Sequence, residues 1–108
     1  MPKFLVQFSY TTDAWKTMTQ NPQDRTPVIR ALCEKLGGKM EALYYGFGEF
    51  DGLVLADMPD NQSATAVVLA AVSPGHIKNI QTTVLLTPQE LMQAQEKAKA
   101  VTYQGPRS

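Results

Sequence analysis

The sequence predicts an α+β fold in which strands and helices follow one another as β-α-β-β-α-β, with a further helix towards the C-terminus. Two observations lead to this prediction. Some segments carry apolar residues at every second position, as half-buried strands do, and others repeat them at helical spacing. Glycine, proline and capping residues separate these segments where turns are needed. A length of 108 residues is that of one domain.

The first predicted strand spans Lys3 to Tyr10, because its residues alternate in character. Residues two apart share a face, so one face carries Phe4, Val6, Phe8 and Tyr10. Thr11-Thr12 can then cap a short helical turn that carries Trp15 and Met18.

A longer helix is expected to end near Leu36, where Gly37-Gly38 supplies a glycine stop. Its start has two interpretations. Thr26-Pro27 could be the N-cap and first position, or the helix could begin near Pro22 and bend at Pro27.

Residues Lys39 to Phe47 predict the second strand, with Met40, Ala42 and Tyr44 on one face and Leu43, Tyr45 and Phe47 on the other. The glycines and the acid of Gly46–Gly52 indicate a tight reversal. A third strand, Leu53 to Met58, should complete an antiparallel hairpin.

Asp60 or Asn61 can cap the next helix. We expect its stripe of small residues to pack close to the sheet; it consists of Ala64, Val67, Val68, Ala71 and Val72. Ile77 to Leu86 then predicts the fourth strand, and Thr87-Pro88-Gln89-Glu90 forms a capping box for a last helix. That helix has a weak apolar stripe of Leu91, Met92, Ala94 and Ala98.

This order is the split βαβ unit of ferredoxin-like domains, in which two helices cover one face of a four-stranded antiparallel sheet. We expect one such domain over residues 1–103 and a frayed tail over 104–108. Because the other sheet face is also apolar at alternate positions, we expect a second copy of the chain to cover it, as in a dimeric α/β barrel. The partner is therefore the chain itself, as a homodimer or a multiple of dimers.

Composition excludes several classes of function. Ten basic residues balance ten acidic ones and neither forms a block, so we expect no nucleic-acid partner. The apolar run from Ala66 to Val72 is too short to span a membrane, and no secretory signal is visible, so we expect a cytoplasmic protein without membrane contact. A single cysteine, Cys33, excludes an internal disulfide, and we expect no metal and no cofactor.

Several segments together resemble the GYD domain family of small bacterial proteins: Lys3–Thr11, Asn21–Arg25, Leu36–Lys39, Tyr44–Gly52 and Thr82–Thr87. The family signature falls on Gly48, Phe50 and Asp51, with Phe in place of Tyr. The resemblance implies a fold similar to the dimeric α/β barrel group. It implies no agreed activity, cofactor or catalytic residue.

His76 is the only histidine, and histidine is the residue type that a proton-transfer site near neutral pH most often recruits. The segment Ser73-Pro74-Gly75-His76 is equally well explained as a solvated turn. Haem ligation by His76 has no second supporting motif.

Asp51 could orient a ligand amine or act as a base, because loops between rigid strands often carry function. It could equally bond its own backbone and fix the hairpin register. Phe50 precedes it and belongs to the same candidate site.

Tyr10 and Trp15 flank the turn after the first strand and could line a cleft between helices and sheet, where aromatic rings would hold a small apolar molecule. Tyr44 and Tyr45 point to opposite faces, so only one can line that cleft, and Tyr45 is the candidate. The alternative is that these aromatic residues belong to the core. Cys33 is interpreted as a buried, inert thiol.

Two functions therefore remain. The first is a homo-oligomeric module that binds a small apolar or aromatic metabolite without chemistry. The second is a small cofactor-independent enzyme of the monooxygenase, isomerase or decarboxylase type, with His76, Asp51 and a tyrosine as proton carriers. The candidate ligand-binding residues are Tyr10, Trp15, Tyr45, Phe50, Asp51 and His76, and no catalytic residue is assigned.

Overall fold

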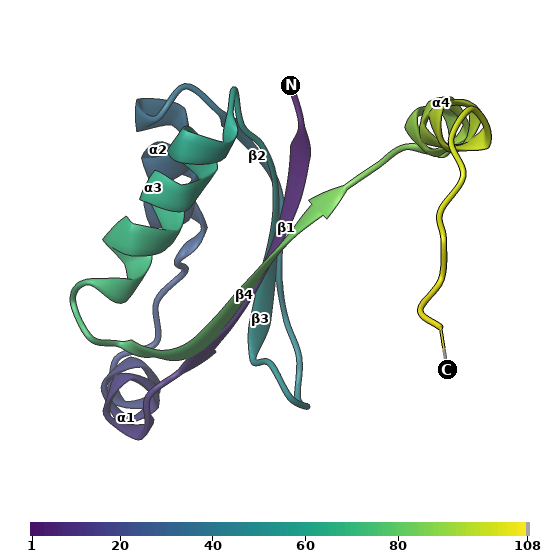
Figure 1. Ribbon diagram of the computed structural model, residues 1–108. Coiled ribbons are helices and arrows are strands. Elements are labelled where there is room, and N and C mark those ends of the chain that lie inside the picture. The colour runs from purple at the N-terminus through teal and green to yellow at the C-terminus, as the bar shows by residue number, and fades with distance from the viewer. Residues whose placement is uncertain (108) are drawn as a thin grey trace.

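The computed structural model describes residues 1–107 and contains four strands and four helices, an α+β fold with one open sheet (Figure 1). The elements are β1 (Lys3–Tyr10), α1 (Thr12–Gln20), α2 (Thr26–Lys35), β2 (Lys39–Tyr45), β3 (Gly52–Asp57), α3 (Asn61–Val72), β4 (Ile77–Leu85) and α4 (Pro88–Lys99). This order confirms the predicted fold class.

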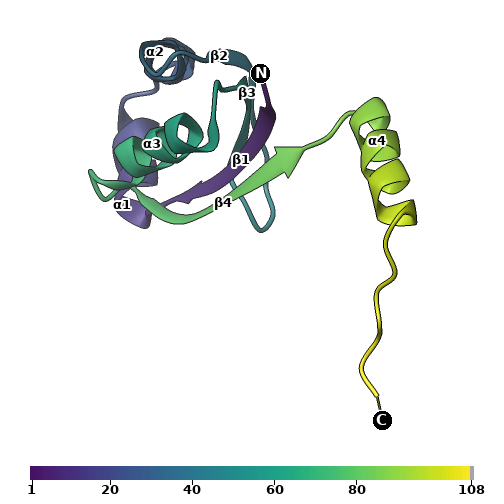
Figure 2. The same ribbon diagram turned by 45° about the horizontal axis from the view of Figure 1, so that its top comes forward.

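The sheet is antiparallel, with strands in the order β2-β3-β1-β4. Strand β1 lies between β3 and β4, so that Gln7 is opposite Leu53 on one side and Gln81 on the other. Helices α2 and α3 lie on one face of the sheet, and α1 lies at the end of the sheet where β1 ends (Figures 1 and 2). The core lies between the sheet and these helices and includes Phe4, Phe8, Cys33, Val54, Met58 and Ala64.

Helix α2 begins at Thr26, with Pro27 in its first turn. The Asp24 carboxylate Oδ1 accepts a hydrogen bond from the Thr26 peptide N at 2.9 Å, and the hydrogen bonds from Thr26 lower the pKa of Asp24. Because this contact satisfies an N–H at the helix start, the helix begins here. The alternative start near Pro22 is wrong.

Helix α1 is longer than the short turn expected from sequence and spans nine residues. The Thr11 hydroxyl caps it by accepting a hydrogen bond from Ala14 N at 3.1 Å. Asp60 does the same for α3, where its Oδ1 accepts from Ser63 N at 2.7 Å, and this contact lowers the Asp60 pKa.

Strand β2 contains an irregularity between Met40 and Ala42 that reverses one part of the predicted face assignment. Met40 is opposite Ala56 and buried, whereas Ala42 is opposite Leu55, on the other face. Glu41 is the additional residue, as in a β-bulge. Met40 therefore shares a face with Leu43 and Tyr45, and the prediction that it sides with Ala42 and Tyr44 was wrong.

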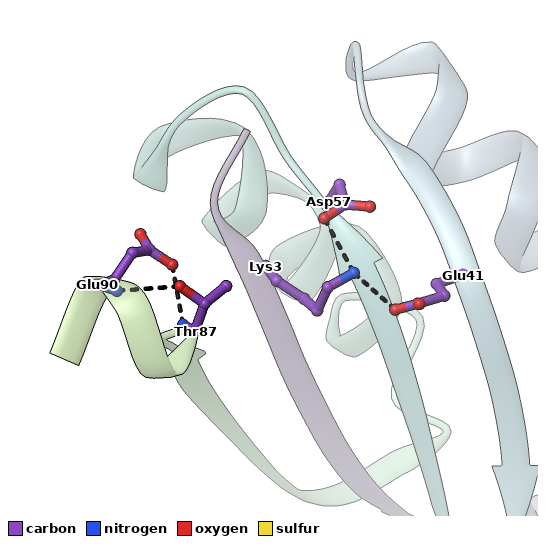
Figure 3. A network of polar contacts seen from close by, with 5 residues as sticks. All are labelled: Lys3, Glu41, Asp57, Thr87 and Glu90. Carbon is purple, nitrogen blue, oxygen red and sulfur yellow. Dashed lines mark hydrogen bonds and ion pairs between the residues drawn. The ribbon is translucent and has the colours of Figure 1, made fainter. Parts of the chain in front are cut away.

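Lys3 connects this irregularity to the neighbouring strands (Figure 3). Its Nζ lies 2.6 Å from a carboxylate oxygen of Glu41 and 3.1 Å from one of Asp57. Hydrogen bonds to these two carboxylates raise the Lys3 pKa.

Strand β2 ends at Tyr45 rather than Phe47, and β3 spans Gly52–Asp57, one residue earlier at each end than predicted. Gly52 is required by packing, because a Cβ placed there would lie 2.5 Å from the Phe8 Cζ atom. The ring of Phe8 therefore sits directly over the start of β3.

No helix among residues 1–107 packs on the second face of the sheet (Figure 1). Register places Leu5, Leu53, Leu55 and Leu85 on this face, and all four are half-buried. Tyr44 shares the face at its β2 edge and is 64% exposed. We refer to this surface as the open face.

Helix α4 extends away from the rest of the chain (Figure 2). It begins with the predicted capping box, in which Glu90 N donates to Thr87 Oγ1 at 3.0 Å and Thr87 N donates to Glu90 Oε1 at 2.9 Å (Figure 3). All its residues are exposed, and Leu91 and Met92 are 49% and 60% exposed. The radius of gyration is 17.5 Å, against about 13 Å for a compact chain of this length.

Residues 102–107 form neither helix nor strand, and the last residue of the predicted tail, Ser108, lies outside the described residues. No helix within residues 1–107 has the length and apolar character needed to cross a membrane.

Candidate ligand site

A cavity of about 310 Å³ lies between the sheet and helices α2 and α3. On the sheet side its wall is formed by Phe4, Val6, Phe8 and Val54, and on the α3 side by Ala64, Val67, Val68, Ala70 and Ala71. The small residues of α3 were expected to bring the helix close to the sheet. Ala64 of this stripe is part of the buried core and Val67 packs against it, and the short side chains of α3 leave a cavity beside them.

Three residues, Tyr10, Arg25 and His76, line both this cavity and a second hollow of about 250 Å³. Asp13 and Gln23 are among the other residues that line the second hollow. We call these three residues the rim, since they lie where the two spaces meet. The cavity is thus apolar inside and polar at one end.

Arg25 immediately precedes α2 and is half-buried. Its Nη1 donates a hydrogen bond to Gln23 Oε1 at 3.1 Å. Within residues 1–107, the ion pairs all involve Lys3, so no described carboxylate pairs with Arg25. A cationic group therefore stands at the polar end of the cavity.

His76 is held at the rim through its backbone. Its carbonyl oxygen accepts a hydrogen bond from Thr11 N at 2.9 Å, and Tyr10 is opposite Ile77 across the β1–β4 pair. The residue is exposed. The turn interpretation and the site interpretation therefore both fit its position.

An aromatic cluster lies beside the rim and consists of Phe8, Tyr10, Trp15 and Tyr45. The Tyr10 ring packs edge-to-face on Phe8 and on Trp15, each at a centroid distance of 5.3 Å. The hydroxyls of Tyr10 and Tyr45 lie 3.3 Å apart. Loss of hydration and this hydrogen bond raise the Tyr45 pKa well above its usual value.

Tyr45 lies on the helix-covered face and Tyr44 on the open face, because they are opposite Gly52 and Leu53. This separation confirms that the two tyrosines point in opposite directions. Tyr10 lines the cavity, but Trp15 and Tyr45 do not. The latter two support the Tyr10 ring from outside.

Asp51 joins the β2–β3 loop to the end of β1 and to α1. Its carboxylate Oδ2 accepts hydrogen bonds from Tyr10 N at 3.0 Å and from Trp15 Nε1 at 2.9 Å. Its peptide N donates to Phe8 O at 2.8 Å. The expected structural alternative was a contact with its own backbone, whereas the observed partners lie 36 and 41 residues away in sequence. Asp51 lines neither hollow.

Phe50 is half-buried and also lines neither hollow. The carbonyl of the preceding Glu49 accepts a hydrogen bond from the buried Ser9 Oγ at 3.1 Å. The signature residues Gly48, Phe50 and Asp51 therefore belong to the β2–β3 loop beside the aromatic cluster, and none of them forms part of the cavity wall.

Of the residues singled out from sequence, the structure brings Tyr10 and His76 to the cavity. Trp15 and Tyr45 belong to the aromatic cluster, and Asp51 is hydrogen-bonded to Trp15. Arg25 was missed. Its only sequence signal is a basic residue directly before a helix start, which is a common and uninformative pattern.

Cys33 faces the cavity and is 0% exposed. Burial raises the pKa of its thiol, which disfavours the reactive thiolate. No cluster of three or more potential metal ligands occurs in the described part of the chain.

The fold and the signature loop define a small α+β domain with an aromatic-flanked cavity. The sequence matches the GYD domain family over residues 4–95, and the chain belongs to that family.

Several solved structures resemble the chain at low sequence identity. MtbAldR (Rv2779c) gives a TM-score of 0.58 at 9% identity, over 80% of this chain and 53% of that one. This chain thus spans about half the length of MtbAldR. TTHA0845 from Thermus thermophilus gives 0.52 at 14% identity, over 81% and 95% of the two chains. FFRP-DM1 gives 0.49 at 10% identity, over 80% and 100%.

The comparison with curated proteins found no match. At these identities MtbAldR and TTHA0845 support the fold alone.

Proposed function

We propose that this GYD domain binds a small apolar or aromatic molecule in the cavity between sheet and helices, without chemical change, and does so as a cytoplasmic homo-oligomer. The observation that carries the proposal is the apolar cavity of about 310 Å³ with a polar rim. Ligand pockets of about 300–1,000 Å³ are usual, and they combine apolar walls with a few placed polar groups.

The size of the cavity suits one aromatic ring with a short chain. An engineered apolar cavity of about 150 Å³ already binds benzene. A space about twice as large, closed on one side by Phe4 and Phe8 and on the other by α3, offers room for a ring and several further carbons.

The proton-transfer groups near the cavity are few, which favours binding over catalysis. The Asp51 carboxylate accepts two hydrogen bonds within the fold and faces Trp15. One observation keeps the enzyme hypothesis open: His76 and Asp51 bind the consecutive residues Thr11 and Tyr10, so they lie at the same end of the sheet. Of these two residues, His76 lines the cavity and Asp51 does not.

The open face supports association with a second copy. Leu5, Leu53, Leu55 and Leu85 form an apolar patch across three strands, and a patch of this kind on a sheet is characteristic of a contact surface. Pairing of two such faces would bury the leucines of both copies.

Helix α4 adds a second argument for association. An isolated helix of 12 residues is marginal in water unless tertiary contacts stabilise it. Because α4 leaves Leu91 and Met92 exposed and extends away from its own sheet, contact with a second copy would supply the missing packing.

Binding in the cavity is tested by NMR titration with phenylbutanol, comparing wild type with Ala71→Leu and Ala66→Leu. Ala71 lines the cavity and Ala66, on the same helix, does not. We expect Ala71→Leu to fill space and abolish binding while Ala66→Leu leaves it unchanged. Equal binding by all three proteins would contradict the proposed location.

Association is tested by sedimentation equilibrium at micromolar concentration. We expect a dimer or a multiple of dimers for wild type and a folded monomer for Leu55→Lys. Thr82→Lys is the matched control, because Thr82 is exposed and opposite Val6, on the helix-side face. A monomeric wild type would contradict the role of the open face.

A further inference from the structure

The ends of the cavity differ in chemistry. Its interior is formed by aliphatic and aromatic side chains, and its charged lining residue within residues 1–107 is Arg25, with His76 nearby at the rim. A purely apolar ligand would use only the interior. It would leave the Arg25 guanidinium at the polar end of the cavity without a hydrogen-bond acceptor on the ligand.

The carboxylates close to Arg25 in sequence or space are engaged elsewhere or lie beyond the rim. Asp24 Oδ1 accepts from the Thr26 peptide N at the start of α2. Asp13 lines the smaller hollow and not the cavity, and it makes no ion pair with Arg25.

The guanidinium has donors available for a ligand. An arginine carries five N–H donors in a planar fork that matches a carboxylate, and the hydrogen bond that the fold supplies goes to Gln23 Oε1. The Tyr10 hydroxyl is oriented towards Tyr45, so Tyr10 contributes its ring as a wall. His76 contributes a second nitrogen-bearing side chain at the same rim.

Building on the proposed function, we infer that the ligand is a small aromatic or aliphatic carboxylic acid, with its apolar part in the cavity and its carboxylate on Arg25 beside His76. The two halves of such a molecule correspond to the two ends of the cavity. Asp13 also lines the smaller hollow, and its negative charge disfavours an anionic group that extends into that space.

The test compares two probes of the same shape, phenylbutyrate and phenylbutanol, which differ in the charged group. Both are titrated by NMR and calorimetry into the full chain in the same buffer. The wild-type protein is compared with Arg25→Gln and with Arg30→Gln. Arg30 is the matched control because it lies on α2, is exposed and lines neither hollow.

We expect wild type and Arg30→Gln to bind the acid about tenfold more tightly than the alcohol, the scale of a charge-assisted hydrogen bond. Arg25→Gln should bring the two affinities within about twofold by weakening the acid alone. The wild-type comparison needs no variant, so it remains valid if Arg25→Gln fails to fold.

Equal affinities of wild type for the acid and the alcohol would overturn the assignment of a carboxylic acid and leave the cavity as an apolar site. Preference for the acid that persists in Arg25→Gln would overturn the role of Arg25. Absence of binding by both probes would overturn the proposed function itself, and the inference with it.

Discussion

The Asp51 carboxylate Oδ2 accepts a hydrogen bond from the Trp15 indole Nε1 at 2.9 Å, across 36 residues of sequence. The same oxygen accepts from Tyr10 N at 3.0 Å. One carboxylate thus holds the β2–β3 loop, the last residue of β1 and the first helix together. A structural role of this kind accounts for an aspartate in the signature loop without assigning it chemistry.

Replacing Asp51 by Ala should destabilise the domain by about 2 kcal/mol, because two donors lose a charged acceptor. Urea unfolding followed by Trp15 fluorescence measures the change. Glu49→Ala is the control: Glu49 is exposed, and its contact to Ser9 uses the backbone carbonyl, which the substitution retains. A destabilisation that is equally large in both variants would contradict the role given to the Asp51 carboxylate.

The hydrogen-bonded pair of Tyr10 and Tyr45 predicts a loss of stability in alkali. The folded-state pKa of Tyr45 is raised above the ordinary value of 10.0. The unfolded chain therefore releases this proton near pH 10 while the folded chain retains it. The stability that the group contributes is complete below pH 10 and is lost as pH rises through the folded-state pKa.

Unfolding by urea between pH 9 and pH 11 tests this effect. The free energy of unfolding should fall less steeply with pH in Tyr45→Phe than in wild type. Tyr44→Phe, next to it on the open face, should follow wild type. Identical pH slopes in all three proteins would show that Tyr45 titrates normally.

Helix α4 should take part in association through its apolar side chains. Leu91→Glu is expected to weaken the oligomer at least tenfold, whereas Gln93→Glu adds the same charge to the same helix and should leave it unchanged. Sedimentation velocity over a concentration series measures both. An unchanged oligomer in Leu91→Glu would place α4 outside the interface.

Asp13 lines the smaller hollow together with the rim residues, and its carboxylate should repel an anionic ligand. Asp13→Asn is therefore expected to tighten phenylbutyrate binding up to severalfold. The effect is modest because water and salt partly screen the repulsion between the Asp13 and ligand carboxylates. Phenylbutanol binding serves as the internal control and should not change. A parallel gain for both probes would indicate a change in shape rather than charge.

The order of elements was predictable from sequence because it depends on local patterns. The alternation of Lys3–Tyr10 and the capping box at Thr87 both operate over a few residues and are found as predicted. Face assignment in β2 was predicted less well, since one additional residue at Glu41 shifts every position before it to the other face. Nothing in the local sequence marks that irregularity.

The candidate site was predictable only in part. Tyr10 follows from its place in an alternating strand, but the partners of Asp51 lie across the fold and cannot be inferred from spacing. The cavity depends on the separation between α3 and the sheet. A stripe of small residues is compatible either with close packing or with an unfilled gap, and sequence alone does not distinguish them.

Native mass spectrometry of the protein purified gently from its own type of cell, repeated under denaturing conditions, tests ligand binding and association together. We expect a dimer or a multiple of dimers that carries a small molecule, released on denaturation and bearing a carboxyl group. An empty monomer would contradict both the cavity as a binding site and the open face as a contact surface.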